Sequence, residues 1–454
     1  MASCVSNALP LHAAARFGLG AKPGELTIIG NDPRGWTSQQ LKQPRLPASL
    51  TPDDALKFLV RETQGEKNRL ILTDAVDPAN RNKTEELRPY FLKHTAARFA
   101  EQASTDQPFL ERLVLFWSNH FTVSLEKVLV AGMVHRYEYE AIRPHVLGYF
   151  SDMLLAVARS PAMLYYLDNA QSIGPNSRIG TRRDKRGLNE NLAREILELH
   201  TLGVEGGYSQ PDVVALANII TGWTLAKVPG SPSVTALAFE FMPAMHEPGE
   251  KLLLGKRIAE AGEEEGVAAL RMLANHPSTA RHLATKLARH FIHDTPPSAA
   301  VEALTRSYLQ SGGHLGTVMQ TLIALPESWQ HPLVKVKTPY EYLLSAYRLT
   351  QADLRANALR RSFESLNYRP FSAGSPKGEP DTAADWAAPD AVMKRIEWAH
   401  RFSQILPART DPMQLATEAL GDALTANTRQ TIERAASGSD GIAFLLASPE
   451  FMRR

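Results

Sequence analysis

The chain has 454 residues, with 50 Lys or Arg against 48 Asp or Glu and a formal net charge of +2. This balance argues against a strongly basic nucleic-acid-binding protein, and a hydrophobic fraction of 44% excludes wholesale disorder. The single cysteine, Cys4, excludes an intramolecular disulfide and any multi-cysteine metal site. No apolar run reaches about 18 residues, so we expect no transmembrane segment. The first residues lack the basic and apolar regions of a signal peptide, which favours a cytoplasmic location.

Apolar residues recur at intervals of three and four along most of the chain, and Pro or Gly separates the segments. This pattern predicts a mainly α fold, with a large multi-helix body. We expect helices near residues 53–64, 84–103, 107–121, 127–158, 189–202, 210–222, 263–275, 278–293, 297–312, 314–325, 339–350, 389–404, 412–421, 425–436 and 440–447.

One region has a different period. Leu237, Phe239 and Phe241 alternate, and residues 251–254 follow a turn that contains Pro and Gly. This predicts one short β-hairpin near 237–254, packed on the helices because a two-stranded ribbon is marginal alone. No repeat or clean linker divides the chain, so we predict a single domain over 1–454 with a soft boundary near 225.

Two segments, 171–188 and 368–388, predict long loops, which in compact proteins are often functional or mobile. The first is basic, with Arg178, Arg182, Arg183, Lys185 and Arg186, but its basic run contains no aromatic residue for base stacking. We therefore expect no nucleic-acid partner.

The segment 189–202 is amphipathic in an unusual way. On a helical wheel Asn191, Arg194, Glu195 and Glu198 share one face. One interpretation is a solvated face with an i,i+4 pair between Arg194 and Glu198. The other is functional, because two carboxylates spaced i,i+3 can share a proton, hold a divalent cation or position a water molecule.

The functional interpretation makes a geometric prediction. The polar face contains no lysine, so we expect it to be mostly buried and to face a cavity shared with Asn119 or His120. His200 falls on the apolar side of the same helix, where it is either a core histidine or a ligand.

Three other places carry candidate groups. His120 ends a helix among large apolar residues, as a core histidine or as a general base or metal ligand. Asp168 ends another helix, where a carboxylate opposes the helix dipole unless a cation or a donor compensates. The segment 276–293 carries a basic stripe that we interpret as a solvated face rather than an anion site, formed by His282, Lys286, Arg289 and His293.

Several motifs occur in an order that resembles a bacterial family catalogued as a domain of unknown function, DUF1800. They lie at residues 16–18, 116–123, 189–204, 207–213, 221–223, 246–251, 276–291, 335–341 and 447–451. The resemblance spans nearly the whole chain and implies one helical fold without an established activity. Many relatives are exported and are found beside a sulfatase- or alkaline-phosphatase-like family, which implies such a partner and export as the alternative location. Where relatives often have Gly-Trp-Pro, this chain has Gly378, Glu379 and Pro380.

These observations support competing functions. In the first, the protein is a hydrolytic or metal-assisted acid/base enzyme using a buried Glu/Arg/His cluster, with a divalent metal as a possible cofactor. Its catalytic candidates are His120, Asp168, Arg194, Glu195 and Glu198, and its substrate-binding candidates are Asn119, Asn191 and His200.

The second hypothesis is a helical binding or assembly protein without catalysis, because no complete catalytic signature is present. The third is a haem or metal carrier that uses His120 or His200.

Overall fold

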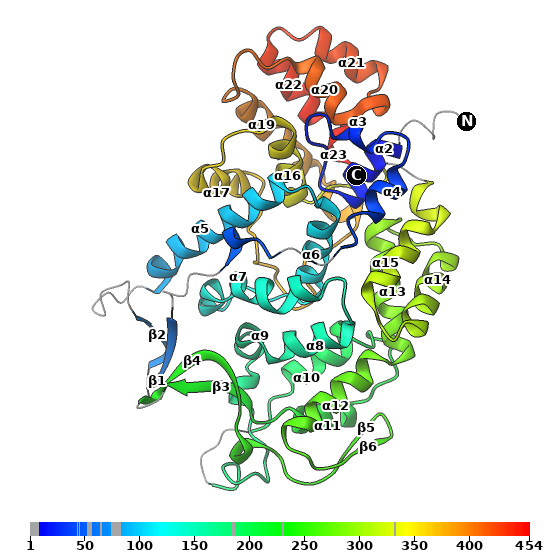
Figure 1. The fold of residues 1–454 in the computed structure, drawn as a ribbon. Coiled ribbons are helices and arrows are strands. Elements are labelled where there is room, and N and C mark those ends of the chain that lie inside the picture. The colour runs from blue at the N-terminus through cyan, green and yellow to red at the C-terminus, as the bar shows by residue number, and fades with distance from the viewer. Residues whose placement is uncertain are drawn as a thin grey trace.

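The structure is a computed structural model that describes residues 9–42, 44, 46–51, 57–63, 66–73, 83–182, 187–228, 231–330 and 333–454. Within these residues the chain is mainly helical, which confirms the predicted fold class (Figure 1). None of the described helices is long and apolar enough to cross a membrane. Three features of the sequence lie outside the described residues: Cys4, the basic residues 183–186 and the beginning of the predicted helix 53–64.

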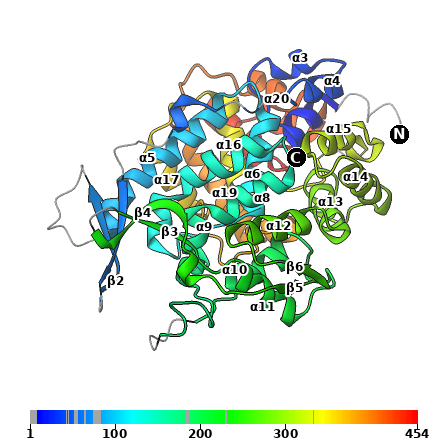
Figure 2. The same cartoon turned by 60° about the horizontal axis from the view of Figure 1, so that its bottom comes forward.

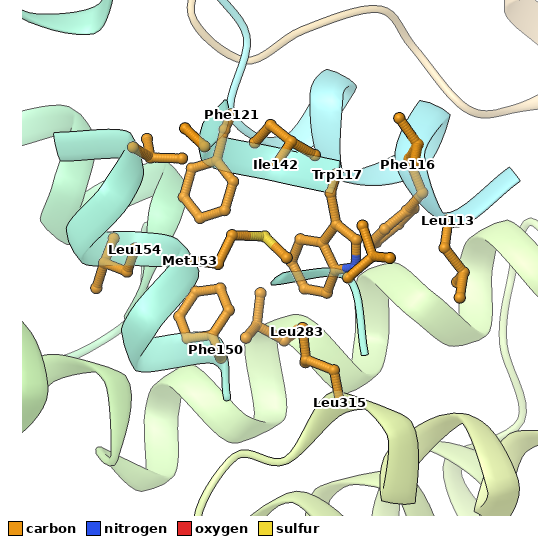
Figure 3. Close-up of a cluster of buried hydrophobic side chains, with 14 of the residues drawn as sticks. Leu113, Phe116, Trp117, Phe121, Ile142, Phe150, Met153, Leu154, Leu283 and Leu315 are labelled. Atoms are coloured by element: carbon orange, nitrogen blue, oxygen red, sulfur yellow. The ribbon is translucent and has the colours of Figure 1, made fainter. Parts of the chain in front are cut away.

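Helix α6 (Pro108–His120) lies at the centre of the main hydrophobic core. Its first residue is a proline, which suits the first turn because the missing N–H has no intrahelical acceptor there. Trp117 on this helix is 1% exposed, and Figure 3 shows it packed among Phe121, which directly follows the helix, and Phe150 and Leu283 from two other parts of the chain. The long helix α5 (Lys83–Ser104) precedes α6, as the period predicted.

The helices of the segment 263–325 agree with the predicted ones. They are α12 (Glu263–Ala274), α13 (Pro277–Phe291), α14 (Ser298–Gln310) and α15 (Leu315–Ala324). α13 lies beside α14, and α14 beside α15. Histidines begin two of these helices: His276 accepts from Ser278 N–H, and His314 from Thr317 N–H.

The predicted continuous helix over 127–158 is wrong. The chain instead forms four short helical pieces and then restarts as α8 (Phe150–Arg159). Gly132 and Gly148 weaken a helix, and Pro144 lacks the N–H that an interior position needs. The pieces are η3 (Val128–Gly132), α7 (Val134–Tyr137), η4 (Glu138–Ile142) and η5 (Arg143–His145).

The predicted helix near 53–64 is also wrong, because β1 (Lys57–Thr63) occupies most of it. β1 pairs with β2 (Glu66–Thr73) and with β4 (Ser231–Phe241), and β3 (Trp223–Val228) completes an antiparallel sheet in the order β2-β1-β4-β3. Both views place this sheet at one edge of the helical body (Figure 1, Figure 2). A short apolar run such as 58–60 fits a strand or a helix equally, and only the strands with which it pairs decide between them.

Both strands of the predicted hairpin exist, but they do not pair with each other. β4 pairs with β3, opposing Trp223 to Phe241. β5 (Lys251–Leu253) pairs with β6 (Lys256–Ile258) instead. The turn between them has positive φ at both Leu254 (49°) and Gly255 (71°), the backbone of a tight two-residue hairpin.

The two ends of the chain meet. Short N-terminal helices that the period did not predict lie near the C-terminal helices (Figure 1), with α3 against α20. The N-terminal pieces are α2 (Leu9–His12), η1 (Ala13–Phe17), α3 (Glu25–Ile29) and α4 (Pro33–Ser38). The C-terminal ones are α19 (Pro389–Ser403), α20 (Pro412–Leu420), α21 (Ala426–Glu433), α22 (Gly438–Ala447) and α23 (Pro449–Met452).

A second hydrophobic cluster joins the C-terminal helices to α16 (Pro339–Thr350) and α17 (Ala356–Ser365), the latter not predicted. Leu26 packs against both clusters. The single domain with a soft boundary near 225 stays a prediction. The remaining helical pieces are α9 (Pro161–Tyr166), η6 (Asn169–Gln171), α10 (Asn191–Glu195), η7 (Ile196–His200), α11 (Gln210–Ile219) and α18 (Ala383–Trp386).

Candidate functional site

A cavity of about 510 Å³ lies between α6, α13, the start of α16 and the predicted loop 368–388. This volume suits a small molecule. Apolar side chains such as Leu115, Phe116 and Phe371 form part of the wall. Its ionisable lining residues are Arg98, His120, Lys286, Arg289, His290, Tyr340, Glu341, Tyr368, Lys377, Glu379, Asp381 and Asp385.

Asn119, at the end of α6, holds the loop over the cavity. Its side-chain nitrogen donates to the carbonyl oxygen of Glu379 at 2.9 Å, and its side-chain oxygen accepts from Glu379 N–H at 2.7 Å. Gly378 has φ +83°, and a Cβ there would lie 2.4 Å from the carbonyl oxygen of Asn119, so the close approach requires glycine. The contacts thus give Asn119 a positioning role, while its predicted substrate contact stays a prediction.

Glu341, on the cavity wall, is neutralised by two buried guanidinium groups. It pairs with Arg112, and Nε of Arg454 lies 3.1 Å from its carboxylate. Burial alone would raise the pKa of Glu341, but Arg454 and Arg112 outweigh it and hold that pKa well below its usual range. The carboxylate is therefore charged and occupied at neutral pH.

Asp381, on the loop, is occupied in the same way. Its Oδ2 lies 2.7 Å from Nδ1 of His290, and its Oδ1 lies 3.2 Å from Nζ of Lys335 and 3.3 Å from Arg454. Burial lowers the pKa of His290 to about 4 despite the nearby Asp381. His290 is thus neutral at pH 7 and donates from Nδ1, and its buried Nε2 has no hydrogen-bond partner in the part of the chain that the structure describes.

A third ion pair supports the cavity from the side of α5. Arg98 makes two bonds to Glu138, at 2.7 and 2.6 Å, and donates to the hydroxyl of Tyr340 at 2.7 Å. Ser118 donates to Glu138 at 2.6 Å. Burial alone would raise the pKa of Glu138, but Arg98 and then Arg143 lower it to about 2.

Lys286 differs from these paired groups. Its amino group has no hydrogen-bond or ion-pair partner among the described residues, although it lines the cavity from α13. Burial lowers the pKa of Lys286 to about 8, with Asp381 opposing the shift and Arg289 and Lys377 adding to it. Arg289 donates to the carbonyl oxygen of Asp294 at 3.3 Å, and Lys377 is exposed. Together Lys286, Arg289 and Lys377 form a cationic wall.

Two further groups on the loop have uncompensated polar ends. Burial raises the pKa of the Glu379 carboxyl, whose side chain has no partner within the described ranges. Burial also raises the pKa of Tyr368, with Glu379 adding to the effect. Position 379, where the family resemblance leads us to expect Trp, therefore places an acid on the cavity wall.

Three histidines lie close enough to Lys286 for its charge to act on them. The ring of His120 lies 6.1 Å from that of His200 and 6.3 Å from that of His282. Nε2 of His120 contacts the carbonyl oxygen of His200 at 3.2 Å, and that of His282 the carbonyl oxygen of Leu199 at 3.1 Å. Burial first, and then Lys286, lower the pKa of all three imidazoles, which are neutral at pH 7.

The predicted buried polar face is wrong. Asn191 is exposed, Arg194, Glu195 and Glu198 are only partly buried, and none of them lines the cavity. Arg194 bonds to Glu190 at 2.9 Å rather than to Glu198, and Glu198 accepts from Tyr208 at 3.1 Å. The apolar side of the helix, including His200, takes the core position, so the amphipathic pattern orients the helix as the solvated interpretation required.

A cation compensates Asp168, as expected for a carboxylate at the C-terminal end of a helix. It adopts positive φ (58°), and Lys127 bonds both to its carboxylate at 2.5 Å and to the carbonyl oxygen of Tyr165 at 3.3 Å. A lysine at the last carbonyl groups of α9 compensates the helix dipole. Asp168 does not line the cavity either.

The structure thus brings only Asn119 and His120 of the predicted site to the cavity. The sequence missed Lys286, Glu379 and Asp381 as site residues. Lys286 was interpreted as part of a solvated stripe, and the only signal for Glu379 was its departure from the relatives' motif. Among the residues that the structure describes, no three His, Cys, Asp or Glu side chains converge to hold a metal ion. The metal, haem and catalytic roles stay predictions.

The comparisons with known proteins give a family but no activity. A family model described as "Protein of unknown function (DUF1800)" matches residues 12–453. No curated protein matches the chain, and no solved structure does.

Proposed function

The chain belongs to the DUF1800 family, and we propose that it is an enzyme that binds a small anionic molecule in the cavity and acts on it by acid/base chemistry. One observation carries this proposal. Lys286, Arg289 and Lys377 border a cavity of ligand size without carboxylate partners in the described chain, whereas two of its acids, Glu341 and Asp381, are neutralised by ion pairs and burial raises the pKa of a third, Glu379. Uncompensated cations in a partly closed site favour an anion.

The acid/base part rests on two groups whose affinities for a proton are shifted in opposite directions. Because the pKa of Lys286 is about 8, an appreciable fraction of its amine is neutral at pH 7 and can accept a proton. The raised pKa of Glu379 makes its carboxyl group easier to protonate, as a proton donor requires. Pairs of this kind mark acid and base roles, and hydrolysis is one reaction that such a pair serves.

The competing function is anion binding without catalysis. A second candidate site remains at Glu195 and Glu198, where burial first and then the neighbouring Glu198 raise the pKa of Glu195, so the two carboxylates lie close enough to interact. The metal-assisted hypothesis would use this pair together with Arg194, whereas Asp168 is paired with Lys127 instead.

Thermal melts with small anions test the proposal. Inorganic phosphate, sulfate and citrate are added separately to the purified chain, to Lys286→Met and to the control Arg281→Met, which removes an exposed charge from the same helix. A ligand at 100 times its Kd stabilises by about 2.7 kcal/mol. We expect at least one anion to raise the melting temperature of the wild type and the control, and to act much less on Lys286→Met. No shift with any anion, or equal shifts in all three proteins, contradicts the proposal.

The bacterial source, the sulfatase- or alkaline-phosphatase-like partner and the cellular location belong to the proposal too, since they rest on the family resemblance. Expression of the full gene in a bacterium, followed by fractionation, checks the location. Recovery in the cytoplasmic fraction supports the first expectation, and recovery outside the inner membrane supports export.

A further inference from the structure

We infer that Lys286 is a nucleophile whose amine forms an imine with a small aldehyde or ketone that carries a carboxylate or phosphate group. This inference rests on the proposed function and names its substrate class. It draws on the contacts of Lys286, on the charges around it and on the cavity in front of it.

The contacts of Lys286, which is partly buried, differ from those of the fully buried lysines. Lys251 donates to Glu265 at 2.7 Å and to a carbonyl oxygen at 2.6 Å. Lys335 donates to Asp294 at 2.6 Å, and Lys337 donates to a carbonyl oxygen at 2.7 Å while it lies 4.3 Å from the centre of the Phe451 ring. Lys286 has no such acceptor in the described chain. Lys286 is only partly buried and its amine lines the cavity, so partial desolvation without an acceptor disfavours the charged form and leaves the amine open to a ligand.

The charged and titratable groups around Lys286 increase the neutral fraction of its amine. They lie on α6, η7, α13 and the loop 368–388: His120, His200, His282, Arg289, Lys377 and Asp381. The three imidazoles are neutral at pH 7, and the two other side chains of the cationic wall repel an ammonium. Asp381 is the one carboxylate that acts on it, and His290, Lys335 and Arg454 already share its charge. Desolvation next to other cations is a known way to make a lysine nucleophilic.

The cavity sets the class of carbonyl compound. Arg289 and Lys377 offer hydrogen-bond donors and positive charge to a carboxylate or phosphate, and Leu115, Phe116 and Phe371 offer an apolar surface to a short carbon chain. A small molecule with an anionic group at one end and a carbonyl group at the other matches both parts.

The step is balanced without an oxidant or reductant. The nitrogen lone pair of Lys286 attacks the carbonyl carbon, and a C–N bond forms as the C=O π bond breaks. The carbinolamine then loses its oxygen as water, and both hydrogens of that water derive from the amine. The product is a neutral imine, or an iminium when one further proton is bound, and Glu379 is the acid on the cavity wall that can supply it.

Reductive trapping tests this inference. The full chain is incubated with glyoxylate, the smallest aldehyde that carries a carboxylate, together with sodium cyanoborohydride at pH 7, and the modified lysine is located by peptide mass spectrometry. Propanal is the neutral probe, and glyceraldehyde 3-phosphate is the phosphate-bearing one. Lys377 is the internal reference because it is an exposed lysine beside the same cavity. Lys286→Arg keeps the charge and removes the nucleophile.

We expect glyoxylate or the phosphate probe to modify Lys286 roughly tenfold or more faster than Lys377, because the cavity holds the anionic probe against Lys286 and the lowered pKa of Lys286, about 8, increases the neutral fraction of its amine at pH 7. Propanal should react more slowly with Lys286 than the anionic probes do. Equal modification of Lys286 and Lys377, or no modification of Lys286, overturns the inference even if Lys286→Arg fails to fold, since both lysines are measured in the wild type.

The outcome is separable from that of the proposed function. If the anions stabilise the wild type but Lys286 is not trapped, the cavity binds anions and the imine inference alone fails. If no anion stabilises the protein and Lys286 is not trapped, both fail.

Discussion

The buried ion pair between Arg98 and Glu138 gives a prediction whose size follows from the structure. Glu138 is 4% exposed, and Glu138→Gln leaves the guanidinium of Arg98 without its charge partner. Breaking one side of a buried pair costs about 3–5 kcal/mol. The pKa of Glu138 falls from 4.5 to about 2 on folding, which at about 1.36 kcal/mol per pH unit is roughly 3 kcal/mol and agrees with that range.

The effect has a defined pH dependence. Because the folded pKa of Glu138 lies below the unfolded value, the carboxylate stabilises the folded state fully above about pH 4.5, and this contribution is lost as the pH falls towards 2. We therefore expect the difference in unfolding free energy between wild type and Glu138→Gln to fall by more than half between pH 7 and pH 3. Urea unfolding at the two pH values measures it.

The same short helix supplies a matched control. Glu140 pairs with Arg136 at the surface, where the two side chains are 52% and 50% exposed. Exposed i,i+4 pairs contribute about 0.3–0.5 kcal/mol, so Glu140→Gln should change stability very little at either pH. A loss for Glu138→Gln below about 1 kcal/mol at pH 7, or a loss that does not change with pH, would refute the argument.

Three further outcomes are expected. Gly378→Ala should destabilise by more than about 1 kcal/mol in thermal melts because φ is +83° and its Cβ meets Asn119, whereas Gly374→Ala, with open space and no positive φ, should be nearly neutral. Asn119→Ala removes both clamps on Glu379, so we expect a loss of about 1–3 kcal/mol and faster proteolysis within 368–388; an unchanged cleavage rate would contradict the clamp. Glu195→Gln should be neutral or slightly stabilising at pH 7, because the raised pKa of Glu195 penalises its charged form, and any gain should vanish below about pH 4.5; clear destabilisation in a urea titration would contradict this.

Periodicity predicted the structure correctly where a segment contains its own apolar pattern. The helices of 263–325 show an apolar stripe in sequence, and the burial of that stripe determines their position. The pattern failed where long-range pairing decides the structure. Strand β1 pairs with its neighbour β2 and, far along the chain, with β4, and the segment 58–60 alone contains no sign of either partner.

The prediction of the site from the sequence failed for a related reason. The sequence shows that 189–202 has a polar face, but not whether that face meets solvent or a cavity. The sequence is equally ambiguous about the polar face that contains Lys286, but this face does line a cavity. A lysine on an amphipathic helix is usually solvated, and only the loop 368–388, held down by Asn119, turns this one into a cavity residue.

The charge network behind the cavity explains why Lys286 is the exception. Ionic groups in an interior seldom stabilise more than apolar residues of the same volume, so the cluster of Arg112, Glu341, Arg454 and Asp381 adds little stability in itself. Its effect on the cavity is electrostatic. Glu341 and Asp381 each contact at least two cations, and neither carboxylate is left to pair with Lys286. The amine of Lys286 therefore faces the cavity without a counter-ion, and a ligand is the partner that the arrangement leaves room for.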